Sequence, residues 1–113
     1  MELKKTKEGE ITLVTIAGRL DSTNYIGVEK RLTAIVDKDE RILLLDCTDL
    51  EFISSAGLRT LLGILKKMTA VEGKFSLCSL SDKIKKIFEM SGFHKLFTIY
   101  GTRAEALKDL AEV

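Results

Sequence analysis

The sequence lacks most of the residues on which metal sites, disulfides and rigid turns depend. It has no proline and no tryptophan, a single histidine, and two cysteines that stand apart as Cys47 and Cys78. Because it holds neither a Cys-x-x-Cys pair nor a histidine at metal-ligand spacing, we expect no metal site and no cofactor. The two cysteines are instead expected to be small buried thiols.

Neither sign of charge dominates the chain. Eighteen Lys and Arg residues oppose 17 Asp and Glu residues, which leaves a formal charge of +1. A chain without a strong basic field is not expected to bind nucleic acid or an anionic membrane surface. The polar start MELKKTKEGE has no apolar signal core, and the longest purely aliphatic run, residues 42–45, is far too short to cross a bilayer. We therefore expect a cytoplasmic protein.

The length and composition are those of one globular domain. With 113 residues, 45% hydrophobic and 31% charged, the chain has room for one compact core and little more. No repeat, linker or low-complexity tract divides it, so its organisation is interpreted from periodicity.

The first third of the chain predicts a β-hairpin followed by an amphipathic helix. Residues 4–6 and 10–17 are the expected strands, joined by a turn at residues 7–9. In the second strand the side chains alternate between two faces, one with Ile11 and Leu13 and the other with Val14 and Ile16. Residues 18–24 are rich in capping residues, and apolar side chains then recur at helical spacing from Val28 to Val36.

The middle of the chain predicts a central strand and a helix that packs on it. Residues 41–46 are aliphatic at their centre, which is typical of a parallel strand buried on both faces. A helical stripe follows and ends at Glu72-Gly73. The stripe consists of Leu58, Leu61, Leu62, Leu65 and Met68. Of these, Leu61 and Leu62 are expected to lie mainly in the core against the central strand.

The last third predicts two further strand-helix units. Residues 75–78 and 96–100 are the strands; the intervening helix stops at Gly92, and Thr102 with Glu105 has capping-box spacing for a terminal helix. The order is then β-β-α-β-α-β-α-β-α. It predicts an α/β domain whose mixed, mostly parallel sheet of four to five strands is packed with about four helices.

The stretch FISSAGLRTLL, residues 52–62, lies where this fold places functional groups. It joins the central strand to its helix, and ligands of parallel sheets collect beyond the carboxyl ends of the strands. Asp21, in the loop after the second strand, is expected at the same edge of the sheet. The two loops are therefore expected to lie close together.

The residues alone leave more than one role open for the hydroxyls of Ser54 and Ser55. A nucleophilic serine is disfavoured, because Ile53 replaces the first glycine of a Gly-x-Ser-x-Gly elbow and nothing indicates that His94 reaches it as a base. An acyl-phosphate at Asp46 lacks an acidic pair to hold Mg²⁺. We therefore expect no enzyme. Helix capping and phosphate acceptance both remain possible.

Residues 46–58, DCTDLEFISSAGL, resemble the signature of the STAS domain of anti-sigma factor antagonists. Gly18-Arg19-Leu20-Asp21 resembles the first loop of that family, and Ser91-Gly92-Phe93 resembles its later Ser-Gly-apolar turn. The resemblance extends along nearly the whole chain. It implies that residues 1–113 form a single STAS domain.

The resemblance implies a partner switch controlled by phosphorylation. The unphosphorylated domain would bind an anti-sigma factor that is also a serine kinase and so release sigma factor; phosphorylation would end binding, and a serine phosphatase would reset the switch. In the family the phosphorylated serine lies two positions before the motif's glycine, which is Ser55 here. Many antagonists have aspartate before it and serine after it, where this chain has Ser54 and Ala56. The implied partner surface comprises Asp21, Ser22, Thr23, Ser54, Ser55, Ala56, Gly57 and Arg59.

STAS domains also serve as constitutive interaction modules. By this resemblance, the chain could also be such a module of a stressosome, a transporter or another signalling assembly, without phosphoserine control. This remains the alternative function.

Overall fold

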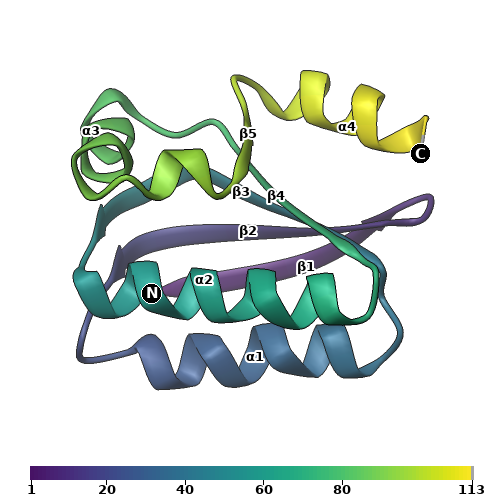
Figure 1. Cartoon of the computed structure of the whole chain (residues 1–113), viewed down its shortest axis with the longest axis horizontal. Helices are drawn as coiled ribbons and strands as arrows, with labels where there is room; N and C mark the ends of the chain where they lie inside the picture. Colours follow the sequence, from purple (N-terminus) through teal and green to yellow (C-terminus); the bar gives the residue numbers. More distant parts are fainter. Residues whose placement is uncertain (113) are drawn as a thin grey trace.

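The computed structural model of the chain describes residues 1–112, whose strands form one mixed sheet (Figure 1). The strand order is β1-β2-β3-β4-β5. The first two strands are antiparallel, and each later strand is parallel to its neighbour. The bounds are β1 Glu2–Glu8, β2 Ile11–Leu20, β3 Ile42–Ile53, β4 Lys74–Cys78 and β5 Thr98–Tyr100. The predicted α/β class and element order are confirmed.

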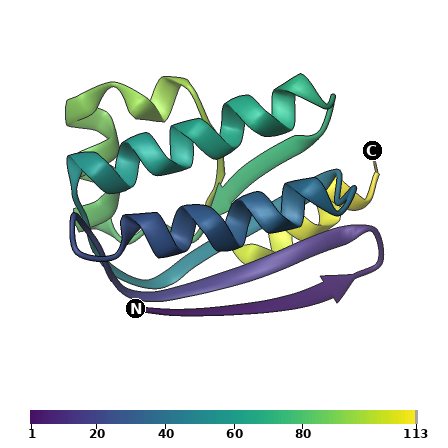
Figure 2. The same ribbon diagram turned by 90° about the horizontal axis from the view of Figure 1, so that it is seen from below.

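Helices cover both faces of the sheet. In Figure 1 the sheet lies between α4 above and the pair α1 and α2 below. Seen from below, α1 and α2 run side by side across the same face (Figure 2). The bounds are α1 Tyr25–Asp37, α2 Ser55–Ala70, α3 Asp82–Ser91 and α4 Arg103–Ala111, and a short 3₁₀ helix, η1, covers Phe93–Lys95. The sequence did not predict η1.

Two hydrophobic cores follow from the alternation of β2. Val14 and Ile16 belong to the larger core, which α1, α2 and α3 close. Ile11 and Leu13 face the other way and pack in a smaller core with Leu110 of α4. The predicted division of this strand between two faces is confirmed, because a period of two places successive side chains on opposite sides. Both predicted buried cysteines are also confirmed, as free thiols in the interior.

The two strands that carry the motif are longer than predicted. β3 was expected to end at Asp46 but runs to Ile53, and β2 continues from Ala17 to Leu20. Beyond Asp46, β3 pairs only with β2, and the register shifts twice along this part. The shifts add residues to β3 and break the alternation that reveals a strand. β1 in the hairpin is longer than the predicted strand at residues 4–6. At the other end of the chain, β5 is shorter than the predicted strand at residues 96–100.

The core face of α2 is rotated from the predicted stripe. Leu61 is fully buried, as expected, but Leu62 and Leu65 are only partly buried. Ile64, which the stripe left out, is fully buried. The helix thus presents positions 57, 61, 64 and 68 to the sheet, at the spacing of three and four residues that one helical face requires.

Candidate functional site at the start of helix α2

Ser54 connects the ends of two strands to the first turn of α2. Its backbone N–H donates to the carbonyl of Leu20 at 2.9 Å, which joins the end of β3 to the end of β2. Its side-chain oxygen accepts from the N–H of Gly57 at 3.2 Å. Ser54 is therefore the N-cap of α2, and its hydroxyl satisfies one of the N–H groups that a helix start leaves free.

Ser55 is the first residue of α2, and its side chain is exposed. The first turn contains no acidic residue that would offset the positive end of the helix dipole. Arg59 lies one turn further along and is also exposed. A hydroxyl at this position is accessible to a partner, and an anion there would lie in a favourable field.

Gly57 allows α2 to start directly against the strand ends. A Cβ at this position would lie 2.8 Å from Cγ1 of Ile53 and 2.9 Å from both Cγ and the carbonyl oxygen of Leu20. No other residue fits without moving the backbone of β2. Gly57 is buried, so it shapes the predicted partner surface from beneath, whereas Ala56 beside it is partly exposed.

The loop that carries Asp21 is held rigidly beside this helix start. The Asp21 carboxylate accepts from the N–H of Thr23 at 3.0 Å and from its hydroxyl at 2.6 Å. These hydrogen bonds, with the Arg19 guanidinium 3.7 Å away, hold the pKa of Asp21 below its usual value. Asn24 closes the turn by donating to the Arg19 carbonyl at 2.7 Å. Ser22 and Thr23 are exposed at the tip of the loop.

A cation-aromatic cluster borders the same edge of the sheet. The guanidinium carbon of Arg19 lies 4.4 Å from the centre of the Phe52 ring, and the Lys83 ammonium lies 6.0 Å from it. These side chains come from β2, β3 and α3. Sequence reasoning missed this cluster, because Arg19 and Phe52 come together only through the extended pairing of β2 with β3.

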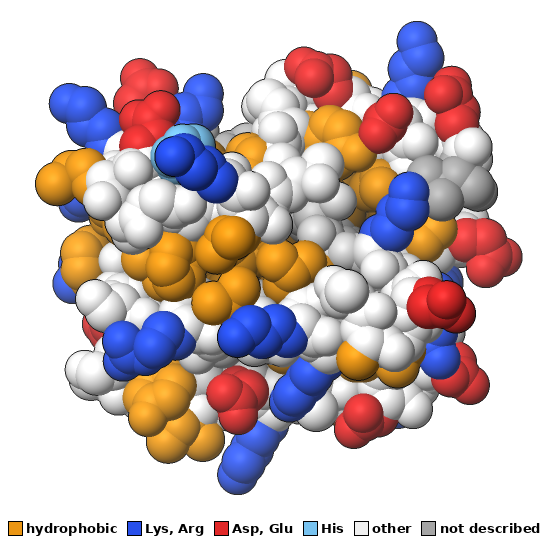
Figure 3. All heavy atoms as spheres, in the orientation of Figure 1, with side chains coloured by type: hydrophobic (Ala, Val, Ile, Leu, Met, Phe, Trp, Pro, Cys, Tyr) orange, Lys and Arg blue, Asp and Glu red, His pale blue; other side chains and the backbone are white. Residues whose placement is uncertain are grey.

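An open groove of about 520 Å³ runs from Ser55 to helix α3. Its sides include Phe52 and Leu58 near the motif and Ile87 and Met90 on α3. Met90 is 87% exposed, which leaves a large apolar residue in contact with solvent. Figure 3 shows apolar atoms gathered on this side of the molecule, over α2 and toward α3. Sequence reasoning missed Met90.

Asp46 is buried in the interior of the fold and does not line this groove. Its side chain is 3% exposed and pairs with the Arg103 guanidinium of α4 at 2.7 Å. Thr48 donates its hydroxyl and its N–H to the other carboxylate oxygen, at 2.6 and 2.9 Å. Burial raises the pKa of Asp46, but the Thr48 and Arg103 hydrogen bonds outweigh it and hold the pKa below its usual value.

Within residues 1–112, no cluster of three or more His, Cys, Asp and Glu side chains is placed to hold a metal ion. In the same part of the chain, none of the helices combines the length and the apolar character that crossing a membrane requires.

Known proteins resemble the chain over almost all of its length. A family model described as the STAS domain matches residues 2–106. BtrV of Bordetella bronchiseptica, which is named provisionally as an anti-sigma factor antagonist, is 37% identical over 106 residues, covering 94% of this chain and 91% of BtrV.

Solved structures show the same fold. A Thermotoga maritima protein, also described provisionally as an anti-sigma factor antagonist, has a TM-score of 0.90 at 21% identity, covering 95% of this chain and 92% of that one. The Bacillus anti-sigma factor antagonist SpoIIAA has TM-scores of 0.76 unphosphorylated and 0.75 phosphorylated, at 17% and 20% identity. These two matches cover 99% and 96% of this chain and 100% and 99% of SpoIIAA. Because the STAS family model matches residues 2–106 and BtrV is 37% identical over 94% of the chain, the chain belongs to the STAS domain family.

Proposed function

We propose that this protein is an anti-sigma factor antagonist that works as a phosphorylation-controlled partner switch. Its unphosphorylated form binds an anti-sigma factor that is also a serine kinase, and this binding releases sigma factor. Phosphorylation of Ser55 ends the binding, and a serine phosphatase restores it. The proposal places the protein in the cytoplasm, with the transcription machinery it regulates.

The observation that carries this proposal is the exposed Ser55 hydroxyl at the border of the groove. The rigid Asp21 loop lies on one side, joined to the motif by the hydrogen bond from Ser54 to Leu20. Met90 and Ile87 of α3 lie on the other side. A partner that binds across both sides would cover Ser55, so a chemical change at this hydroxyl would act at the centre of the interface.

The geometry favours Ser55 over Ser54 as the phosphate acceptor. The Ser54 oxygen already accepts the Gly57 N–H, so a phosphate there would disturb the cap on which α2 depends. Ser55 is exposed in the first turn of α2, and no hydrogen bond of the cap depends on its hydroxyl. The names of the relatives support the same role, and SpoIIAA, a protein of this fold, is described in both phosphorylated and unphosphorylated forms.

A phosphate on Ser55 is compatible with the free domain but not with a closely packed interface. At the start of α2, the free N–H groups and the helix dipole stabilise a negative charge. Against a partner, the same group adds about −1.5 to −2 charges and must be desolvated beside apolar side chains such as Leu58 and Met90. A loss of ~3 kcal/mol lowers affinity more than about a hundredfold, which is enough to redistribute the kinase.

The test is phosphorylation by a kinase that co-purifies with the protein. With that kinase and Mg·ATP, intact mass should rise by one phosphate, and fragmentation should place it on Ser55. Ser55→Ala should abolish the gain while retaining kinase binding, because the lost hydroxyl is small. Ser55→Asp should weaken binding, although a carboxylate carries less charge than a phosphate.

Ser54→Ala is the matched control. It should still accept phosphate at Ser55, with reduced stability from the lost cap. Modification of Ser54 in the Ser55→Ala protein would place the acceptor one residue earlier. If neither serine accepts phosphate from any bound kinase, the protein is better explained as a constitutive STAS interaction module of a stressosome, a transporter or another signalling assembly.

A further inference from the structure

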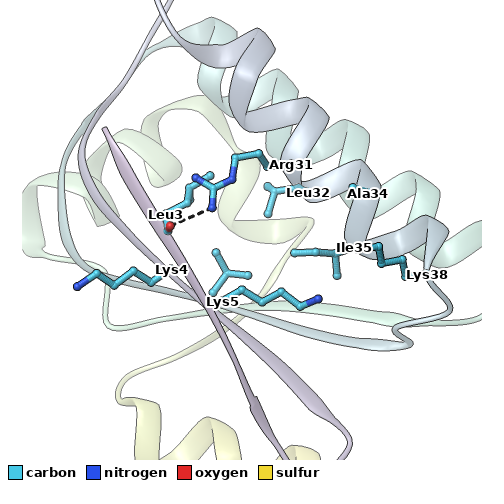
Figure 4. A pocket seen from close by; sticks show the side chains of 9 residues that line it. Leu3, Lys4, Lys5, Arg31, Leu32, Ala34, Ile35 and Lys38 are labelled. Carbon is cyan, nitrogen blue, oxygen red and sulfur yellow. Dashed lines mark hydrogen bonds between the residues drawn. The ribbon is translucent and has the colours of Figure 1, made fainter.

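A second hollow, called the cleft below, lies between helix α1 and the edge strand β1. It shares no residue with the groove at Ser55. It has a volume of about 200 Å³ (Figure 4). Its floor is apolar: Val14 of β2 and Leu32 of α1 are buried, while Leu3 and Ile35 keep 8% and 7% of their surface exposed. The apolar floor distinguishes this hollow from an ordinary charged surface.

The cleft exists because β1 does not complete the core beneath α1. Leu3 faces α1, and the period of two along a strand puts Lys5 on the same face, opposite Val14. An inward lysine on an edge strand discourages pairing with another sheet edge. A lysine stem can also cover apolar surface, and Val14 opposite Lys5 keeps only 1% of its surface exposed.

The rim of the cleft is cationic, and none of its nine lining residues is acidic. Lys5 lies 3.8 Å from Glu40, but Glu40 pairs more closely with Lys7, at 2.7 Å. No ion pair holds Lys38 among residues 1–112. In Figure 4, Arg31 reaches across the cleft from α1, and its guanidinium donates to the Leu3 carbonyl at 3.0 Å.

We propose that this cleft binds a medium-chain fatty carboxylate. The alkyl chain would lie on the floor of Val14, Leu32 and Ile35 and displace the Lys5 stem. The carboxylate would accept from Arg31, exchanging a bond to a neutral carbonyl for a stronger charge-assisted one. A hollow of about 200 Å³ is smaller than the ~300–1,000 Å³ of pockets that hold drug-sized ligands, so the chain should be of medium length, as in octanoate.

The test is a titration of the whole protein with sodium octanoate below its critical micelle concentration, followed by amide chemical shifts. Saturable changes should centre on Leu3, Lys5 and Ile35. Octan-1-ol lacks the charge and acetate lacks the chain, so each should bind at least about tenfold more weakly.

Ala34 supplies a matched pair of variants, because it lines the cleft and is exposed on α1. Ala34→Glu should weaken octanoate binding at least about tenfold, because it puts a like charge at the rim. Ala34→Gln has the same shape without the charge and should retain binding within about twofold. Absence of saturable shifts, equal affinity for octan-1-ol, an unchanged affinity in Ala34→Glu, or shifts confined to the Ser55 groove would each overturn the proposal.

Discussion

Gly57 holds the first turn of α2 against the carboxyl ends of β2 and β3, and this contact brings Ser55 to the surface beside the Asp21 loop. The space for a Cβ at position 57 is limited partly by a backbone atom, the Leu20 carbonyl oxygen, which cannot rotate away as a side chain can. At the scale of single residues, the site therefore depends on the close approach of Gly57 to the strand ends as much as on the chemistry of its hydroxyls. Ser54 and Leu20 are joined at the same point.

Gly57→Ala should destabilise the protein by ~1–3 kcal/mol, because the added methyl would overlap Leu20 and Ile53. Urea denaturation measures this as a lower free energy of unfolding. Gly63 is the control, since it lies inside the same helix and a Cβ there meets nothing within 4 Å. Gly63→Ala should be neutral or should stabilise by up to about 1 kcal/mol. Equal stability of the two variants would contradict the close contact at Gly57.

Asp46 gives the protein a specific dependence on acid pH. Its pKa is lower in the folded protein than the ordinary aspartate value of ~3.9, so its stabilising contribution is complete above that value and is lost as pH falls through the folded pKa. The free energy of unfolding should therefore decline as pH falls below about 4. In Asp46→Asn, stability at pH 7 should be lower and the acid decline shallower. Urea titrations at several pH values measure both, and an unchanged slope in the variant would exclude Asp46 as a source of the decline.

At the scale of elements, α2 connects the core to the site, so its packing face determines where Ser55 lies. Leu61→Ala should lower the free energy of unfolding by ~2–5 kcal/mol, because Leu61 is fully buried on the sheet-facing side of the helix. Leu62→Ala should cost clearly less, because this side chain is only partly buried. Chemical denaturation of the two variants compares them directly. The reverse order would mean that α2 is rotated from its described position.

The elements show what periodicity can and cannot predict. The first half of β3 and α4 were predicted well, because an aliphatic run and a capping box are local signals. The second half of β3 was not, because exposed Thr48, Asp49 and Glu51 resemble a loop and the two register shifts break the alternation. A strand paired on one side only, with polar side chains on its open surface, carries no local hydrophobic signal.

At the scale of the whole molecule, the position of the motif could be predicted, but its surroundings could not. Parallel topology places the ends of β2 and β3 at one edge of the sheet, so proximity of Asp21 to the Ser54-Ser55 pair follows from element order alone. The groove also needs Met90 of α3, which is far away in sequence and is positioned by packing of Phe88 in the core. No pattern near the motif indicates which face of α3 will turn toward it.

The side chains that the whole fold brings together around Ser55 also explain why the protein should not phosphorylate itself. The groove beside Ser55 is lined by Phe52, Ile53, Leu58, Ile87 and Met90 with two further serines, and offers no carboxylate or imidazole to act as a base. The lone histidine, His94, has its Nδ1 3.3 Å from the carbonyl oxygen of Phe88 on α3. Highly purified protein incubated alone with Mg·ATP should therefore keep its mass, as measured by intact mass spectrometry. Ser55→Ala protein treated in parallel controls for adduct formation. Autophosphorylation that a substitution elsewhere in this chain abolished would show that the protein supplies its own catalytic groups, and a passive substrate would then be the wrong description of Ser55.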